Sequence, residues 1–131
     1  VNGSATPGDE IHLTGGGVVP VNIQWTASES LSGTIELVHN GVVVASKQAS
    51  VGLGTPDSLS VPSVNFARSG WLCARTMGSS GHQLHTAAVF VTVDGLPVRA
   101  NGADAQFYVD WMNSLLANTS PGGPSFTSMC R

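Results

Sequence analysis

One close pair of histidines is the first feature of this sequence that could carry chemistry, because neutral imidazole is a common zinc ligand. His82 and His85 lie three positions apart, after a Gly-Ser-Ser-Gly loop and at the start of a predicted strand. In a strand, side chains at that spacing point to opposite faces. A zinc site would need further converging ligands, and Cys73 and Cys130 have no CxxC spacing. The pattern favours local hydrogen bonding by the two rings, and it predicts no metal ligand and no cofactor.

Nucleophilic and phosphate-binding motifs are missing from the sequence, which therefore predicts no catalytic residue. There is no Gly-x-Ser-x-Gly elbow, the turn that presents a nucleophilic serine in many hydrolases. The glycines at 15–17 and 52–54 neither open a predicted helix nor precede a lysine, as a phosphate loop would require. Cys73 and Cys130 allow one disulfide. The alternative for Cys73, in an apolar stretch, is burial as a small hydrophobic residue.

Three tryptophans raise the question of carbohydrate binding, because flat aromatic faces stack on the apolar faces of sugars. Trp71 begins an apolar strand and Trp111 lies on the apolar stripe of a predicted helix, so core packing is favoured for both. Trp25 shares one strand face with aliphatic residues, while Asn22 and Gln24 lie on the opposite face. Core packing is also the first interpretation of Trp25. The alternative is a ligand-binding patch formed by Trp25, Asn22 and Gln24.

Length and charge limit the classes of function. The chain has 131 residues, enough for one domain, of which 41% are hydrophobic and only 10% charged. Five basic residues against eight acidic ones argue against nucleic-acid binding, which depends on Lys and Arg. No apolar run approaches the roughly 20 residues of a membrane span. The chain begins without methionine or a signal-like segment, so we expect it to be a piece of a longer polypeptide.

Elements that would position these residues are mostly strands. Apolar and polar residues alternate clearly over 19–27, and Asn40-Gly41 is a favoured type I′ hairpin turn between the runs 34–38 and 42–45. Residues 46–56 suggest loop or weak strand, and 84–93 is the longest continuous β pattern. Altogether the sequence predicts about seven or eight short strands at roughly ten-residue spacing. That spacing predicts a mainly β fold, an immunoglobulin-like antiparallel β-sandwich.

The end of the chain changes to helical periodicity. Phe107, Trp111 and Leu115 recur every four residues, which predicts one C-terminal α-helix over about 103–118. We expect residues 1–9 to be a leading linker. Residues 10–118 should then form a single sandwich domain, closed by the helix packing its apolar stripe on the sheets. Residues 119–131 should form a flexible tail.

Several short motifs occur together in an order that resembles a known family. They are Ser-Gly-Trp-Leu-Cys-Ala-Arg at 69–75, His-Thr-Ala-Ala-Val-Phe-Val at 85–91, Asp104 and Trp111 in the helix, and the hairpin at 35–41. Over about residues 20–117 they resemble the C-terminal module that follows the catalytic domain in CehA/McbA-type metallohydrolases of the PHP superfamily. In that family the preceding domain holds the metals, partly through a His-x-His motif. This chain has no His-x-His, so the resemblance implies no metal ligand here.

The residues that match these motifs are Trp71, Arg75, His85 and Thr86. Either Arg75 and His85 bond across neighbouring strands, or these residues contact a catalytic domain elsewhere in the same polypeptide. The resemblance implies a non-catalytic accessory domain of a bacterial hydrolase, which is expected to be secreted or periplasmic. One alternative is a secreted module that binds carbohydrate or a surface through Trp25, Asn22 and Gln24. Another is a self-contained hydrolase or metal protein centred on His82 and His85.

Overall fold

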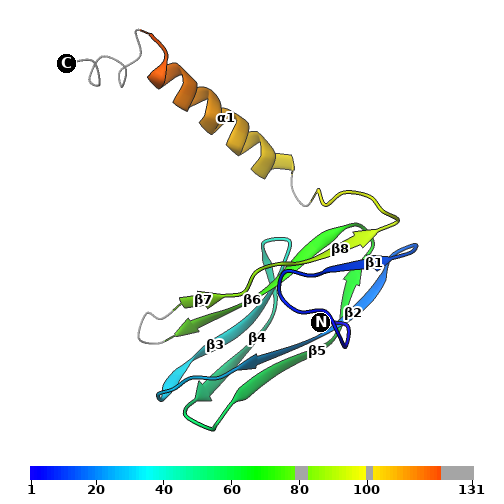
Figure 1. Ribbon diagram of the computed structural model, residues 1–131, viewed down its shortest axis with the longest axis vertical. Helices are drawn as coiled ribbons and strands as arrows, with labels where there is room; N and C mark the ends of the chain where they lie inside the picture. The colour runs from blue at the N-terminus through cyan, green and yellow to red at the C-terminus, as the bar shows by residue number, and fades with distance from the viewer. Residues whose placement is uncertain (79–82, 100–101, 122–131) are drawn as a thin grey trace, which may run out of the picture. The chain divides into compact units, whose positions relative to one another are not determined.

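The computed structural model describes residues 1–78, 83–99 and 102–121 (Figure 1). The chain divides into two compact units, 1–100 and 101–131, and each is described here by itself. All strands lie in the first unit and the helix lies in the second. The first unit contains β1 (Glu10–Leu13), β2 (Gly17–Trp25), β3 (Leu31–His39), β4 (Val42–Val51), β5 (Asp57–Phe66), β6 (Gly70–Gly78), β7 (Gln83–His85) and β8 (Val89–Val93), and the second contains α1 (Gly102–Thr119).

The strands form two sheets of unequal size. The larger sheet has the order β1-β8-β6-β3-β4, with β7 also pairing with β6, and the smaller sheet is the pair β2-β5. The order β8-β6-β3-β4 opposite β2-β5 matches the G-F-C-C′ and B-E arrangement of immunoglobulin domains. The predicted immunoglobulin-like sandwich with a C-terminal helix is therefore confirmed. One pairing departs from the antiparallel expectation, because β1 runs parallel to β8.

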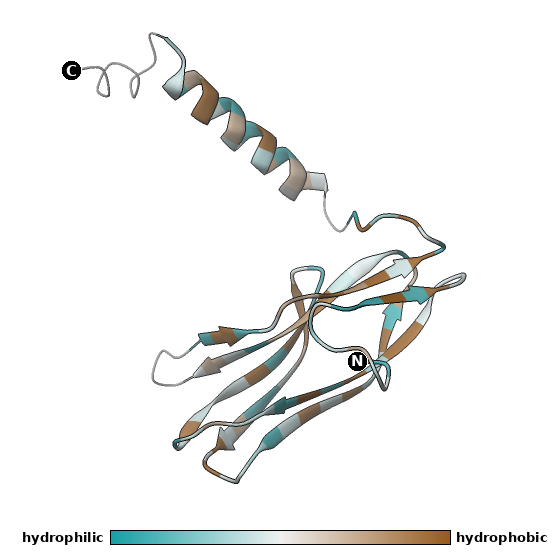
Figure 2. Cartoon of the chain, viewed as in Figure 1, coloured by the Kyte–Doolittle hydropathy of each residue, from teal (hydrophilic) through white to brown (hydrophobic). Residues whose placement is uncertain are grey.

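Alternation along the strands builds the core between the sheets (Figure 2). Val19 and Val21 of β2 face the core from the small sheet, and Leu37, Leu72 and Val91 face it from the large one. Intervening positions such as those of Asn22 and Gln24 are exposed. A second cluster at one end of the sandwich contains Trp25, Ile35, Ala49 and Val51. Apolar burial on this pattern is the main force that holds the two sheets together.

The hairpin between β3 and β4 forms as its sequence predicts. Asn40 and Gly41 adopt φ values of 50° and 86°. These positive values are what a type I′ turn requires at its two central residues, and asparagine and glycine tolerate them best. The β3-β4 register shifts once, between Leu37 and Val38. Asn40 also accepts a hydrogen bond from the backbone N–H of Trp71 through its Oδ1, at 2.9 Å. The turn is thereby attached to β6.

Two stretches differ from the sequence prediction. Residues 46–51, expected as loop or weak strand, continue β4, because Ala49 and Val51 are buried in the second core cluster. The continuous β pattern over 84–93 is divided into β7 and β8. Thr86, just after β7, makes two hydrogen bonds to Ala74 of β6. Its backbone N–H donates to the carbonyl of Ala74, and its side-chain Oγ1 accepts from the N–H of Ala74.

Residues 1–9, expected as a linker, are attached to the sandwich in this structure. The N–H of Asn2 donates to the carbonyl of Pro20 at 2.8 Å, and the N–H of Gly8 donates to the carbonyl of Ala88 at 3.0 Å. Val1 and Ala5 pack against the main core. Small polar residues predicted flexibility, but two apolar side chains and the available edge of β2 give this segment a place to bind.

The helix α1 carries a wide apolar surface. Considered by itself, it exposes large apolar side chains along most of its length, and Gln106 donates a hydrogen bond to Asp110 on its polar side. It is not long and apolar enough to cross a membrane, and no other helix is described. Packing of α1 on the sandwich remains a prediction. The exposed residues are Phe107, Tyr108, Val109, Trp111, Met112, Leu115 and Leu116.

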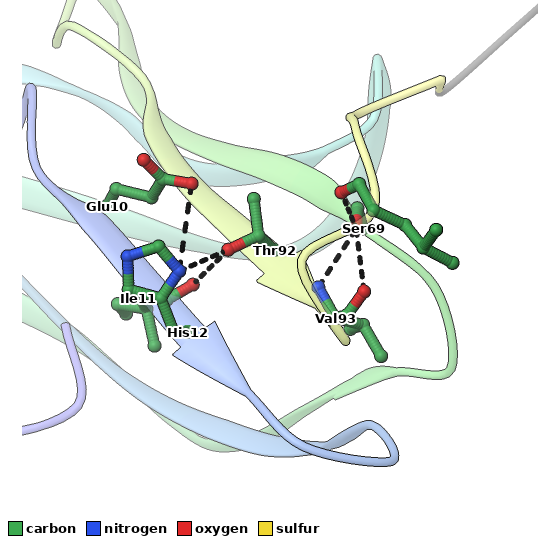
Figure 3. A network of polar contacts seen from close by, with 7 residues as sticks. Glu10, Ile11, His12, Ser69, Thr92 and Val93 are labelled. Carbon is green, nitrogen blue, oxygen red and sulfur yellow. Dashed lines mark hydrogen bonds and ion pairs between the residues drawn. The ribbon is translucent and has the colours of Figure 1, made fainter.

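Polar side chains fasten the ends of the strands (Figure 3). The Nδ1 of His12 lies 2.6 Å from the Oγ1 of Thr92, which links β1 to β8. Ser69, which is only 7% exposed, accepts from the N–H of Val93 at 2.9 Å and donates to the carbonyl of Leu96 at 2.6 Å. One hydroxyl therefore joins the β5-β6 turn to the segment that follows β8.

We expect Ser69→Ala to lower the free energy of unfolding by about 1–3 kcal/mol, because it leaves two backbone groups without their partner in a buried place. Urea denaturation of the 131-residue chain measures this effect. Ser46→Ala is the control, since Ser46 is an exposed serine of β4 and should change stability by less than about 0.5 kcal/mol. Equal stability of the two variants would show that the Ser69 hydroxyl contributes nothing.

Candidate functional site

Two adjoining hollows lie along β2, beside a larger one of about 630 Å³ among the N-terminal segment, β2 and β5. One of the two has a volume of about 270 Å³ and lies among β2, β6 and the N-terminal segment. The other, of about 300 Å³, lies among β2, β6 and β7. Ile23, Gln24, Ala74 and Thr86 line both hollows. The two-stranded sheet covers only part of the larger sheet, so that β2 is an edge strand here. We call the two hollows together the β2 opening.

The β2 opening brings together residues that sequence analysis selected for two different reasons. Of the seven selected residues, six line it: Asn22, Gln24, Trp25, Arg75, His85 and Thr86. Trp71 is the exception. It lies at the start of β6, opposite Phe90 of β8, and lines neither hollow. The family-motif residues and the suggested ligand-binding patch therefore share one location, which sequence spacing did not indicate.

Arg75 is held by an ion pair across the large sheet. Its Nε lies 2.5 Å from Oε2 of Glu36 on β3, and the two side chains are 43% and 18% exposed. Glu36 was not selected from the sequence, although a single charge between the buried residues Ile35 and Leu37 calls for a partner. Arg75 thus bonds across neighbouring strands, as one of the two interpretations proposed. At this exposure the pair contributes little stability.

His85 lies opposite Arg75 in the β6-β7 register. Its Nδ1 is 3.3 Å from the carbonyl oxygen of Thr86, and its side chain is exposed. The side chain of Arg75 therefore meets the cross-strand interpretation through Glu36. Among the described residues, the ring of His85 makes no side-chain bond to Arg75 and contacts the carbonyl of its neighbour Thr86 instead. Contact of this ring with another domain remains a prediction. His82 lies outside the described residues, so the predicted spatial relation of the two rings is not described here either.

Trp25 belongs to the core. It is 5% exposed and packs with Ile35, Ala49 and Val51, so neither face of its indole is available for stacking on a sugar. The suggested role of Trp25 as a carbohydrate platform is wrong for this reason. Its Nε1 has no hydrogen-bond partner among the described residues. A buried unpaired N–H of this kind is costly, and it is uncommon in folded proteins.

Asn22 and Gln24 remain accessible on the same strand. Both are exposed, and the Oδ1 of Asn22 accepts a hydrogen bond from Ser60 at 3.3 Å. Pro20 of β2 already accepts a bond from Asn2, so the edge of β2 is in use near its start. Gln24, four residues after Pro20 on the same strand, lines both hollows. Its amide offers donors and an acceptor to a partner at this opening.

Metal ligands do not gather in the part of the chain that the structure describes. Among residues 1–78, 83–99 and 102–121, no group of three or more His, Cys, Asp or Glu side chains is close enough to hold a metal ion. His39, at the end of β3, contacts the ring of Phe66 at a centroid distance of 4.5 Å. Burial lowers the pKa of His39, which favours the neutral form of its ring.

Cys73 lines the smaller hollow, is half-buried, and has no disulfide partner among the described residues. Burial raises the pKa of Cys73, and the nearby positive charge of Arg75 only partly opposes that change. Cys130 lies outside the described residues, so the suggested disulfide stays open. A raised pKa leaves less thiolate, which is the reactive form.

We therefore expect Cys73 in the folded chain to react with iodoacetamide at pH 8 several-fold more slowly than in urea. Mass spectrometry of the peptide that contains Cys73 measures its alkylation separately from that of Cys130. Equal rates in the folded and the urea-unfolded chain would contradict the burial of this thiol. A Cys73 peptide that is alkylated only after reduction would instead reveal a disulfide.

Comparisons with known proteins give little further information. No family model matches the chain, and no curated protein matches it. Among solved structures, the extracellular domain of mouse leukocyte-associated immunoglobulin-like receptor 1, a strand-swapped dimer, is similar with a TM-score of 0.42 and 17% identity. The similarity covers 73% of this chain and 92% of that one. The immunoglobulin-like class rests here on the strand order of the two sheets, and the function must be argued from the β2 opening.

Proposed function

We propose that this chain is a non-catalytic accessory β-sandwich module that binds a neighbouring domain of the same polypeptide through the β2 opening. The observation that carries the proposal is the convergence of six selected residues on the two adjoining hollows. Exposed amides, a half-exposed guanidinium and an exposed imidazole surround apolar side chains there. This combination of an apolar centre with polar groups around it is typical of protein interfaces.

Arg75 is the residue best prepared for such a contact. Glu36 fixes its guanidinium through Nε, and the other N–H groups of an arginine fork can donate hydrogen bonds to a carboxylate or a carbonyl of a partner. His85 lies beside it in the strand register. An arginine that is already positioned loses less side-chain freedom when a partner binds.

The parent protein that we propose is a bacterial, extracytoplasmic metal-dependent hydrolase of the PHP type. This part of the proposal is supported by the order of the motifs at 35–41, 69–75 and 85–91. The catalytic metals would belong to the other domain, and this module would stabilise it. A role in binding carbohydrate is less well supported, because the burial of Trp25 removes the aromatic platform on which it depended.

The reading frame that contains the chain tests the parentage. We expect the frame to encode a further domain with a His-x-His motif and additional Asp and His residues suited to metal binding. A frame with only a signal peptide before this chain would contradict the proposal. The chain would then be a free-standing module, and a saccharide array would be the next experiment.

A phosphodiesterase assay tests the non-catalytic part of the proposal. The 131-residue chain, with Mn²⁺ or Zn²⁺ supplied, should hydrolyse bis(p-nitrophenyl) phosphate no faster than buffer containing the same metal. His85→Ala should leave that background rate unchanged. Hydrolysis by the chain that His85→Ala abolishes would overturn the assignment and favour a self-contained hydrolase.

A further inference from the structure

Two arginines, Arg68 and Arg99, lie near the start of β6, where they line the same part of the surface. Arg68 is in the turn between β5 and β6, and Arg99 is in the segment after β8. The hydroxyl of Ser69 joins these two parts of the chain, because it accepts from the N–H of Val93 and donates to the carbonyl of Leu96. Arg68 and Arg99, which are 31 positions apart in the sequence, are in this way held on the same part of the surface.

Arg68 and Arg99 both line two neighbouring hollows. A hollow of about 340 Å³ and another of about 300 Å³ are each lined by Arg68, Ser69 and Arg99. The first also contains His39, Asn40, Asn65, Phe66 and Ala67, and the second also contains Leu96 and Pro97. No carboxylate is among the lining residues of either hollow. The local charge is therefore positive.

Neither arginine is neutralised within the described part of the chain. The ion pairs found there use Lys47, Arg75 and His12, and Arg68 and Arg99 are exposed without an acidic partner. The protein as a whole is acidic, with five basic residues and a net charge of −3. Two of its five basic residues thus meet in one place in a chain that has few of them. Like charges placed together are unfavourable unless an anion lies between them.

Other polar groups in the larger hollow are suited to anion binding without adding charge. Burial favours the neutral form of His39, and its Nε2 lies 3.1 Å from the Nδ2 of Asn40. Asn65 also lines this hollow and is exposed. Arginine forks bind planar or tetrahedral oxyanions through two parallel hydrogen bonds each.

We infer that Arg68 and Arg99 form a binding site for an oxyanion, a phosphate or a carboxylate, at the end of the sandwich away from the β2 opening. Ser69 is a positioning residue for this site, since it holds the Arg99 segment against the turn that carries Arg68. The inference is independent of the proposed docking function, because Arg68 and Arg99 line neither hollow of the β2 opening.

Nuclear magnetic resonance of the complete 131-residue chain tests the site. Sodium phosphate or sodium succinate is added at pH 7 while sodium chloride keeps the ionic strength constant. We expect saturable shifts at the amides of residues 67–70 and at the Nε resonances of Arg68 and Arg99. Phosphate and succinate are separate arms, so that preference for one identifies whether the site favours phosphate or carboxylate.

Variants that each remove one positive charge make the test specific. Arg68→Gln and Arg99→Gln should each weaken the saturable binding roughly tenfold, because each removes a charge-assisted fork. Lys47→Gln is the control, since Lys47 pairs with Asp57 and lines neither hollow, and it should leave the binding unchanged. The inference is overturned if neither anion gives saturable shifts. It is also overturned if Lys47→Gln weakens binding as much as the arginine variants do.

Discussion

Replacing Trp25 by alanine is expected to lower the free energy of unfolding by about 3–5 kcal/mol, the usual cost of deleting a large buried aromatic side chain. Trp25 is 5% exposed and fills the centre of the second core cluster, against Ile35 and Val51. The cavity would lie between the two sheets, where neither can relax freely because each is held by its own strand ladder. Urea denaturation followed by far-ultraviolet circular dichroism measures the loss.

Trp25→Phe is the matched control for this prediction. It keeps an aromatic ring in the core and also removes the buried Nε1, which has no hydrogen-bond partner among the described residues. The lost volume and the removed unpaired donor act in opposite directions. We therefore expect a change of less than about 1.5 kcal/mol, as for other conservative core substitutions. A Trp25→Ala variant as stable as the unaltered chain would show that the side chain is at the surface, available to a ligand.

Replacing Gly33 by alanine is expected to destabilise the chain by about 3 kcal/mol, at the upper end of overpacking costs. Gly33 is in the central strand β3 and lies opposite Gly78 of β6. A Cβ there would lie 2.4 Å from the carbonyl oxygen of Met77 and 2.8 Å from the Cα of Gly78. Both are backbone atoms, so the β3-β6 ladder would have to separate to admit one methyl group.

Gly102→Ala is the corresponding control. Gly102 is at the start of α1, its φ is not positive, and no atom lies within 4 Å of an added Cβ. Alanine there should leave stability unchanged or raise it slightly, because it favours the helix. Thermal unfolding monitored by circular dichroism compares the two variants. The close approach of β3 and β6 would be contradicted if Gly33→Ala unfolded at the same temperature as Gly102→Ala.

Local patterns predicted most of the strands because their physical causes are local. Alternation in β2 and the Asn40-Gly41 turn each depend on neighbours in the sequence. The end of β4 was left open between loop and weak strand because Ser46, Gln48 and Ser50, its polar positions, resemble a loop. The buried alternate positions, Ala49 and Val51, carried the signal that could have extended the strand.

Contacts between distant residues could not be predicted in the same way. The pairing of β1 with β8 joins positions about 80 residues apart, and its parallel direction depends on where the chain enters the sheet. The partner of Arg75 is Glu36, 39 positions away. A lone charge inside a strand shows that a partner is needed, but only the order of the sheet shows which residue supplies it.

The candidate site was found in parts but not as a whole. Asn22 and Gln24 were selected as neighbours of an aromatic residue, and Arg75, His85 and Thr86 as family motifs. Their meeting at the β2 opening depends on the small sheet having only β2 and β5. Nothing in the sequence alone indicates how many strands each sheet contains. The arrangement of the two sheets is therefore what converts two separate sets of residues into one surface.

Hydrogen exchange measured by mass spectrometry tests the central claim most directly. The 131-residue chain by itself would be compared with the same residues inside the longer polypeptide that the reading frame encodes. Docking at the β2 opening predicts slower exchange in the longer polypeptide for peptides covering Asn22–Trp25 and His85–Thr86, with the β3-β4 turn at Asn40-Gly41 unchanged. Equal exchange at the β2 opening in the two forms, or slowing confined to other surfaces, would contradict the proposed docking function.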